Sequence, residues 1–187
     1  MKKFWIGFIS GILFSFIAMI VLGYFLGRAF YSDDDGLSSP TLQKQDSILI
    51  ANYNLKLVDL KNDTLFKNDL LYGKVVFFNF WEHWCKPCKE ELPSIQRLYN
   101  TVNDSLIVFA IISTEKPEVA KKDKVVLETN LPFYYLNGVL PDLFKGDIVP
   151  RTFIIGKKGE IIIKEIGAAA WDDEKVVELI DSLKAIP

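Results

Sequence analysis

The sequence is poor in the residues that hold metals or cross-link small secreted domains. Its 187 residues include only two cysteines, two methionines and one histidine. A disulfide-rich scaffold would need more cysteines at wider spacings. A zinc site within one chain would need three or four Cys or His ligands. Both classes are therefore disfavoured, whereas a copper carrier that uses two thiolates stays open as an alternative.

The chain also lacks an excess of charge of either sign. It has 22 Lys and Arg against 24 Asp and Glu, which gives a formal net charge of -2, and the two signs are interspersed. A nucleic-acid surface would need clustered Lys and Arg, so we expect no nucleic-acid partner. Half of the residues are hydrophobic, which is typical of a globular protein with room for one good-sized domain and an appendage.

One long hydrophobic run is present, near the N-terminus. Residues 4–26 contain no charged side chain, and about 20 apolar residues are enough for a helix to cross the hydrocarbon core of a membrane. A cleaved signal peptide is the rival interpretation, but its apolar region is usually about 7–15 residues long. Residues 27–31 also make a poor cleavage site. We therefore expect an uncleaved transmembrane helix, within a membrane anchor at residues 1–27.

The charges around this run predict its orientation. Lys2 and Lys3 precede it, and three consecutive aspartates follow at residues 33–35. The positive-inside rule then keeps the N-terminus in the cytoplasm and sends the remainder across, as a single-pass protein of the cell membrane with an extracytoplasmic domain. Residues 28–46, rich in Ser, Asp and Gly, are expected to be a flexible linker.

Residues 47–187 are expected to form one domain in which strands and helices alternate, the pattern of an α/β fold. Nearly continuous apolar runs are typical of central strands, and glycines suit the turn of a hairpin. The expected strands lie at residues 74–81 and 105–112, in a hairpin at 151–155 and 160–166, and in a short extra hairpin at 54–57 and 64–66. Helical spacing predicts helices at residues 87–100, 117–129 and 172–185.

The two cysteines are separated by two residues at a predicted strand-to-helix junction, in Cys85-Lys86-Pro87-Cys88. A disulfide that closes so small a loop stabilises a fold only weakly, so the pair is better explained by chemistry. At the start of a helix, Cys85 would lie beside unsatisfied backbone N–H groups that favour a thiolate. Cys88, one turn later, could resolve a mixed disulfide by attacking Cys85.

Residues 48–187 resemble the thioredoxin superfamily, and specifically the TlpA/ResA-like membrane-anchored thiol–disulfide oxidoreductases. The pattern W-C-x-P-C-x-x-E-x-P is complete from Trp84 to Pro93, after an apolar strand that ends in Asn79-Phe80-Trp81. A second match is Val149-Pro150-Arg151-Thr152, followed by an apolar strand. The resemblance implies a thioredoxin-like fold, a central mixed sheet flanked by helices, with an N-terminal transmembrane helix.

The same resemblance implies the roles of the site residues. Cys85 corresponds to the exposed nucleophile, Cys88 to the buried resolving thiol and Glu91 to an acid that tunes the site. Trp84 flanks the dithiol, Pro150 is a cis-proline that faces it, and Val149 beside it helps to hold the substrate chain. The implied activity is reduction of protein disulfides, including cytochrome c precursors, with electrons from a membrane dithiol donor and without a cofactor or a metal.

Some residues depart from the family pattern or allow a plainer interpretation. Asn79 stands where plain thioredoxins carry a buried aspartate that relays protons. Glu91 is expected to perform part of this proton transfer, unless Glu91 is only a solvated charge. His83 is expected to be an exposed polar residue, with an influence on the thiolate as the less favoured alternative. Arg151 is expected to be a surface cation, and Trp81 to pack in the core. A metal carrier and a binding module with a structural disulfide are the alternative functions.

Overall fold

The computed structural model describes residues 17–22, 36–42 and 49–187, and the chain divides into two units, Met1–Gly36 and Leu37–Pro187. In the first unit, residues 17–22 are helical. No helix within the described residues is both long enough and apolar enough to span a membrane. Most of the expected anchor at residues 1–27 lies outside the described residues.

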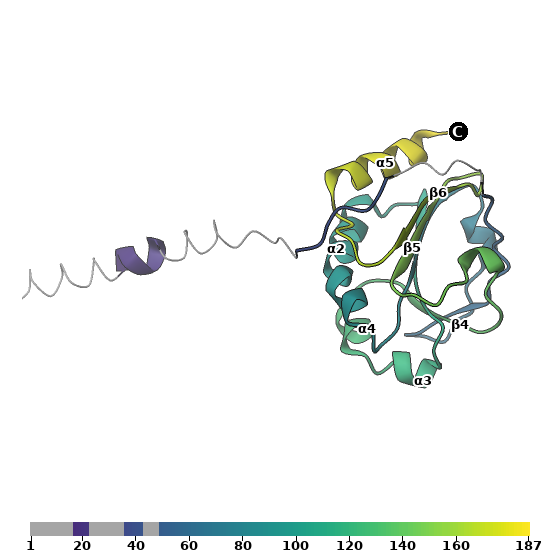
Figure 1. The fold of residues 1–187 in the computed structure, drawn as a ribbon, viewed down its shortest axis with the longest axis horizontal. Coiled ribbons are helices and arrows are strands. Elements are labelled where there is room, and N and C mark those ends of the chain that lie inside the picture. The colour runs from purple at the N-terminus through teal and green to yellow at the C-terminus, as the bar shows by residue number, and fades with distance from the viewer. Residues whose placement is uncertain (1–16, 23–35, 43–48) are drawn as a thin grey trace, which may run out of the picture. The chain divides into compact units, whose positions relative to one another are not determined.

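Six strands of the second unit form one mixed sheet, in the order β1-β4-β3-β2-β5-β6 (Figure 1). Strands β2, β3 and β4 run parallel to one another, whereas β1 pairs antiparallel with β4, β5 with β2, and β6 with β5. The apolar runs that predict central strands form β2 and its neighbour β3. The strands are β1 (Leu57–Asp59), β2 (Val75–Phe80), β3 (Ile107–Ser113), β4 (Phe133–Leu136), β5 (Arg151–Ile155) and β6 (Ile161–Ile166).

The helices α2 and α5 lie on one side of this sheet, and the short helical turns at residues 68–71 and 142–144 lie on the other (Figure 1). Side chains of β2 alternate between the two sides, as the period of a strand requires. Phe77 belongs to the apolar core beneath α2 and α5, whereas Phe78 belongs to the core on the opposite side. The helical elements are η1 (Asn68–Leu71), α2 (Lys86–Val102), α3 (Pro117–Ala120), α4 (Lys124–Glu128), η2 (Asp142–Phe144) and α5 (Glu174–Ala185).

The sequence predicts the thioredoxin-like sheet and its long helices correctly, but one local prediction is wrong and another is displaced by a few residues. The helix expected at residues 117–129 is broken into α3 and α4, because the Asp123 carboxylate accepts a hydrogen bond from Val125 N and caps a new helix. The hairpin expected at residues 54–57 and 64–66 forms with its first strand displaced to Leu57–Asp59, through the Val58–Leu65 bridge and backbone hydrogen bonds from Asp59 N to Thr64 O and from Phe66 N to Leu57 O. Strand β1 also pairs with β4.

A short segment before the sheet, residues 38–41, forms hydrogen bonds with later parts of the second unit. The Ala170 N–H donates to the carbonyl of Ser38 over 2.9 Å, and the Ser39 hydroxyl lies 2.5 Å from the Asp173 carboxylate. The Thr41 N–H donates to Glu165 over 2.7 Å. These residues fall within the stretch expected as a linker, and they tie it to β6 and to the start of α5.

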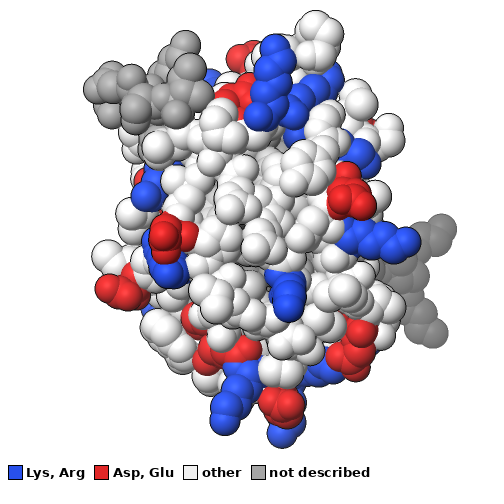
Figure 2. Space-filling model, turned by 90° about the vertical axis from the view of Figure 1, so that its right-hand side faces the viewer, with Lys and Arg blue, Asp and Glu red and all other residues white. Residues whose placement is uncertain are grey.

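The side of the unit that carries η1 and η2 is largely uncharged at its centre (Figure 2). Basic and acidic side chains both lie around the edge of this face (Figure 2).

Candidate active site

The two cysteines lie where β2 passes into α2, and they form a disulfide with an S–S distance of 2.04 Å. Cys85 is the N-cap of α2, and its sulfur accepts a hydrogen bond from Cys88 N over 3.2 Å. Pro87 lies in the first helical turn, where its missing N–H removes no helical hydrogen bond. The first turn of α2 therefore offers a backbone donor to the Cys85 sulfur, which would favour its thiolate.

Cys85 is more buried than the sequence predicts. Its residue surface is only 2% exposed in this oxidised form, and that of Cys88 is 0% exposed. The prediction of an exposed nucleophile is therefore wrong for the disulfide state, because the bond holds Cys85 in the same apolar cluster as Cys88. Trp84, directly before it, is 64% exposed and forms the open rim of the site.

The Val149–Pro150 peptide bond lies at the same edge of the sheet and is cis, as the resemblance implies. Strand β5 runs antiparallel to β2, and its first residue, Arg151, pairs with Phe80 at the end of β2. The loop before β5 and the loop that carries Cys85 therefore meet at one edge. Pro150 is buried, and half-buried Val149 packs against the cluster that contains both cysteines.

Glu91 lies one turn beyond Cys88 on α2 and is 0% exposed. The interpretation of Glu91 as a solvated charge is therefore wrong. Its carboxyl group accepts hydrogen bonds from Asn79 Nδ2 at 2.7 Å, from Trp171 Nε1 at 2.9 Å and from Ala169 N at 3.2 Å. These donors come from β2 and from the loop before α5, so that three segments of the chain meet at Glu91.

Burial raises the pKa of Glu91 to about 7, and the hydrogen bonds from Trp171, Asn79 and Ala169 act in the opposite direction. Burial penalises the charged form of a carboxyl group, whereas N–H donors favour it. The balance leaves an acid that changes its charge near neutral pH, next to the helix turn that carries the thiols.

Asn79 is buried as expected and connects this acid to the strand behind it. Its amide nitrogen donates both to Glu91 and to Thr152 Oγ1, the latter over 2.8 Å. The sequence reasoning missed Thr152 and Trp171 as parts of this network. Trp171 lies 80 positions from Glu91 in the chain, and no motif marks it as a partner.

Arg151 is not a surface cation, contrary to the sequence prediction. The residue is only 5% exposed, and its guanidinium lies over the Phe80 ring, 4.7 Å from the centroid. Its Nε donates to the carbonyl of Phe144 over 3.0 Å, and its Nη1 to that of Ile148 over 2.9 Å. Arg151 is buried because the loop that leads to Pro150 folds over it and supplies these acceptors.

Two other residues near the dithiol have defined places. Trp81 is fully buried and packs edge-on against Phe133, as expected. His83 has a side chain that is 42% exposed, but its Nδ1 lies 2.6 Å from Glu115 Oε1, so it is paired rather than simply solvated. Within the described parts of the chain, no three His, Cys, Asp or Glu side chains gather in a group that could hold a metal ion.

This arrangement can perform thiol–disulfide exchange. A dithiol at a helix N-terminus can cycle between the disulfide seen here and a reduced form whose first sulfur is a nucleophile. The adjacent acid with a pKa of about 7 can exchange a proton in the same pH range as thiols at such a position.

Comparisons with known proteins agree with this chemistry. Residues 50–164 match the model of the AhpC/TSA family. The thiol-disulfide oxidoreductase ResA of Bacillus cereus is 26% identical over 162 residues, which cover 83% of this chain and 88% of that protein. ResA of Halalkalibacterium halodurans is 24% identical over 98% of this chain and 96% of its own length.

Among solved structures, a thiol-disulfide isomerase from Corynebacterium glutamicum superposes with a TM-score of 0.60 at 16% identity, over 76% of this chain and all of that one. At this identity the likeness concerns the fold alone. Together with the matched residues 50–164 and the ResA relatives, the Cys85–Cys88 site at the end of β2 identifies the chain as a member of the AhpC/TSA family, a thioredoxin-like thiol–disulfide oxidoreductase of the ResA type.

Proposed function

We propose that this protein is a membrane-anchored, extracytoplasmic reductase of protein disulfides. The observation that carries the proposal is the position of the Cys85–Cys88 disulfide, which caps α2 at the sheet edge of the cis Val149–Pro150 bond. Buried Glu91 lies one helical turn further on. A purely structural disulfide would need neither a helix N-terminus nor a buried acid of shifted pKa beside it.

In the reducing direction, the Cys85 thiolate attacks one sulfur of a substrate disulfide. The substrate S–S bond breaks, a Cys85–substrate disulfide forms, and the other substrate sulfur leaves as a thiolate that takes up a proton. The Cys88 thiolate then attacks the Cys85 sulfur, which releases the second substrate thiol and leaves the Cys85–Cys88 disulfide. A membrane dithiol donor reduces this disulfide by the same two exchanges and is itself oxidised.

The remaining site residues have distinct roles in this proposal. Glu91 accepts the proton of the Cys88 thiol when that thiol becomes the attacking group, which suits an acid with a pKa of about 7. Exposed Trp84 and half-buried Val149 contact the substrate chain at the rim. Pro150 orients the backbone of Val149 toward that chain.

The location of the protein is inferred from the sequence. An uncharged run at residues 4–26 with lysines before it supports an anchor at residues 1–27 and a domain outside the cytoplasm. The linker at residues 28–46 would join this anchor to the catalytic domain at 47–187. By resemblance to the family, the substrates are envelope proteins, and cytochrome c precursors are the favoured class.

Replacement of each cysteine tests the catalytic roles. In full-length protein in detergent micelles, Cys85→Ala should abolish reduction of insulin disulfides by dithiothreitol-fed enzyme. Cys88→Ala should instead accumulate a mixed disulfide with insulin, because the resolving thiol is absent. Non-reducing gels and mass spectrometry would detect the adduct. Retention of wild-type turnover by both variants would refute the catalytic role of the pair.

The reduction potential of the Cys85–Cys88 pair tests the direction of electron flow. We expect a value near or below the ~-270 mV of thioredoxin, measured by equilibration with dithiothreitol buffers. A potential near the ~-120 mV of the strong oxidant DsbA would assign the protein to disulfide formation instead.

A further inference from the structure

Arg151 is a buried cation that has no part in the exchange reaction itself. It begins β5, directly after the cis Val149–Pro150 bond, at the sheet edge of the dithiol. Burial lowers the pKa of Arg151, and the charges of Glu82 and Asp147 act in the opposite direction. Burying a guanidinium costs free energy unless it is paired and hydrogen-bonded, so the groups around it indicate what it does.

The hydrogen-bond acceptors of Arg151 lie in the loop before the cis-proline. Its Nε donates to the carbonyl of Phe144 over 3.0 Å, and its Nη1 donates to the carbonyl of Ile148 over 2.9 Å. In the described part of the chain, no hydrogen bond between backbone groups reaches residues 146–149. The side chain of Arg151 therefore supplies the fixed contacts that the backbone of this loop does not make for itself.

The two ends of this loop are anchored by packing, whereas its middle is not. Phe144 is fully buried, and its ring packs edge-on against that of Phe153, 5.1 Å away. Val149 packs against both apolar cores, including the one that contains the cysteines. The side chains of residues 145–148 are exposed, that of Ile148 in a residue with 61% of its surface open. The guanidinium thus fixes the loop where packing does not, next to Val149.

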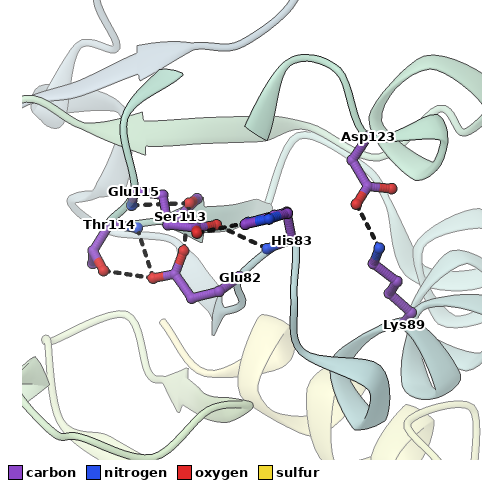
Figure 3. Close-up of polar contacts among 7 residues, drawn as sticks. All are labelled: Glu82, His83, Lys89, Ser113, Thr114, Glu115 and Asp123. Carbon is purple, nitrogen blue, oxygen red and sulfur yellow. Dashed lines mark hydrogen bonds and ion pairs between the residues drawn. The ribbon is translucent and has the colours of Figure 1, made fainter. Parts of the chain in front are cut away.

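The same guanidinium joins this loop to the loop that carries Cys85. It lies over the ring of Phe80, the last residue of β2, 4.7 Å from the centroid. It also faces the charge of Glu82, in the cysteine loop. Figure 3 shows that Glu82 in turn accepts hydrogen bonds from Ser113 Oγ at 2.7 Å and from the Thr114 N–H at 3.1 Å. The loops that follow β2 and β3 and the loop that precedes β5 are therefore connected at one edge.

We propose that Arg151 is a positioning residue that holds residues 144–149 in the conformation that binds the substrate chain beside Cys85. No bond forms or breaks at its guanidinium. The inference rests on the proposed function and deepens it, because Val149 is the substrate contact that this loop carries. Arg151 should therefore affect the reaction with a protein disulfide and leave the reaction with a small disulfide unchanged.

The test measures two second-order rate constants for the reduced full-length protein in detergent micelles at pH 7, one with insulin and one with hydroxyethyl disulfide, which is small and neutral. Arg151→Met should slow the reaction with insulin about tenfold, because two lost hydrogen bonds reduce the fraction of the loop in its binding conformation. Arg151→Lys keeps the charge but loses the planar fork, and should slow it about threefold. The rate with hydroxyethyl disulfide should not change in either variant.

Arg97→Met is the matched control, because it also removes an arginine that joins segments far apart in the chain. The Nε of Arg97 lies 2.5 Å from the Asp172 carboxylate. Arg97 is on α2, about 18 Å along the helix from Cys85 at the usual rise per residue. Its replacement should leave both rate constants unchanged, even where it lowers stability.

Equal rates with insulin for Arg151→Met and Arg97→Met would overturn the inference. Equal slowing of Arg151→Met with both disulfides would also overturn it, because Arg151 would then act on the dithiol rather than on the loop. If Arg151→Met fails to fold, a wild-type rate of Arg151→Lys with insulin overturns it instead. Failure of the proposed function is distinguishable, because the wild-type protein would then reduce hydroxyethyl disulfide but not insulin, and the inference would fall with it.

Discussion

Two buried acids flank the dithiol at equal sequence distance, and their partners differ in kind. Glu82 lies three residues before Cys85, and Glu91 lies three residues after Cys88. The partners of Glu91 are N–H groups of an amide, an indole and the backbone. Glu82 is held mainly by the hydroxyl groups of Ser113 and Thr114.

This difference decides how far the hydrogen bonding of each acid changes when the acid gains or loses a proton. An indole or backbone N–H can only donate, so a protonated Glu91 gives up part of its hydrogen bonding, while an ionised Glu91 keeps a charge in the apolar core. A hydroxyl group can donate or accept, so the partners of Glu82 can adapt to either state. Burial raises the pKa of both acids, but the hydroxyl partners of Glu82 can adapt to the loss of its charge, whereas the N–H partners of Glu91 cannot.

The largest expected effect that separates the two acids is the pH dependence of stability. The pKa of Glu91 is about 7 in the folded protein against an ordinary value of 4.5. Between these values the folded chain holds a proton that the unfolded chain releases, so the free energy of unfolding falls as pH rises. The loss should reach about 3 kcal/mol by pH 8, at about 1.36 kcal/mol per unit. The Glu91→Gln variant should lack this loss of stability with rising pH.

Urea unfolding of the oxidised full-length protein from pH 4.5 to pH 8 would measure this effect. The relevant quantity is how the difference in the free energy of unfolding between Glu91→Gln and wild type changes with pH. Any cost of the amide that is the same at every pH does not affect this change. Parallel stability curves would mean that Glu91 does not change its protonation on unfolding.

Sequence alone could locate the dithiol and the central strands, because their signals are local. The Cys85-Lys86-Pro87-Cys88 motif and the apolar run of β2 are contiguous, so spacing and hydrophobicity were sufficient. The pairing of β1 with residues 64–66 is predictable in the same way, because the two segments are close in sequence. The pairing of β1 with β4 is not, because β4 lies 75 or more positions away.

The surroundings of Glu91 and Arg151 escaped sequence reasoning for a related reason. The family resemblance identifies Glu91 as a site residue, but its burial depends on Trp171 and Ala169, which lie far from it in the sequence. Arg151 carries a charge that ordinarily favours solvent, yet carbonyl groups of the preceding loop and the Phe80 ring accommodate it. Contacts between distant segments decide both cases.

The smallest expected effect concerns the other acid, through Glu82→Gln. The amide oxygen can accept from both donors of Thr114, and the amide nitrogen can donate to the Ser113 hydroxyl oxygen, but the proton of that buried hydroxyl then loses its acceptor. Because burial raises the pKa of Glu82, a neutral side chain costs less at this position than in place of an exposed carboxylate. Urea unfolding at pH 7 should therefore show a free energy of unfolding that is lower by about 1 kcal/mol, the net value of one hydrogen bond. A loss of about 3 kcal/mol would show that the fold needs a charged carboxylate at this position, and the difference in partners between Glu82 and Glu91 would then not separate the two acids.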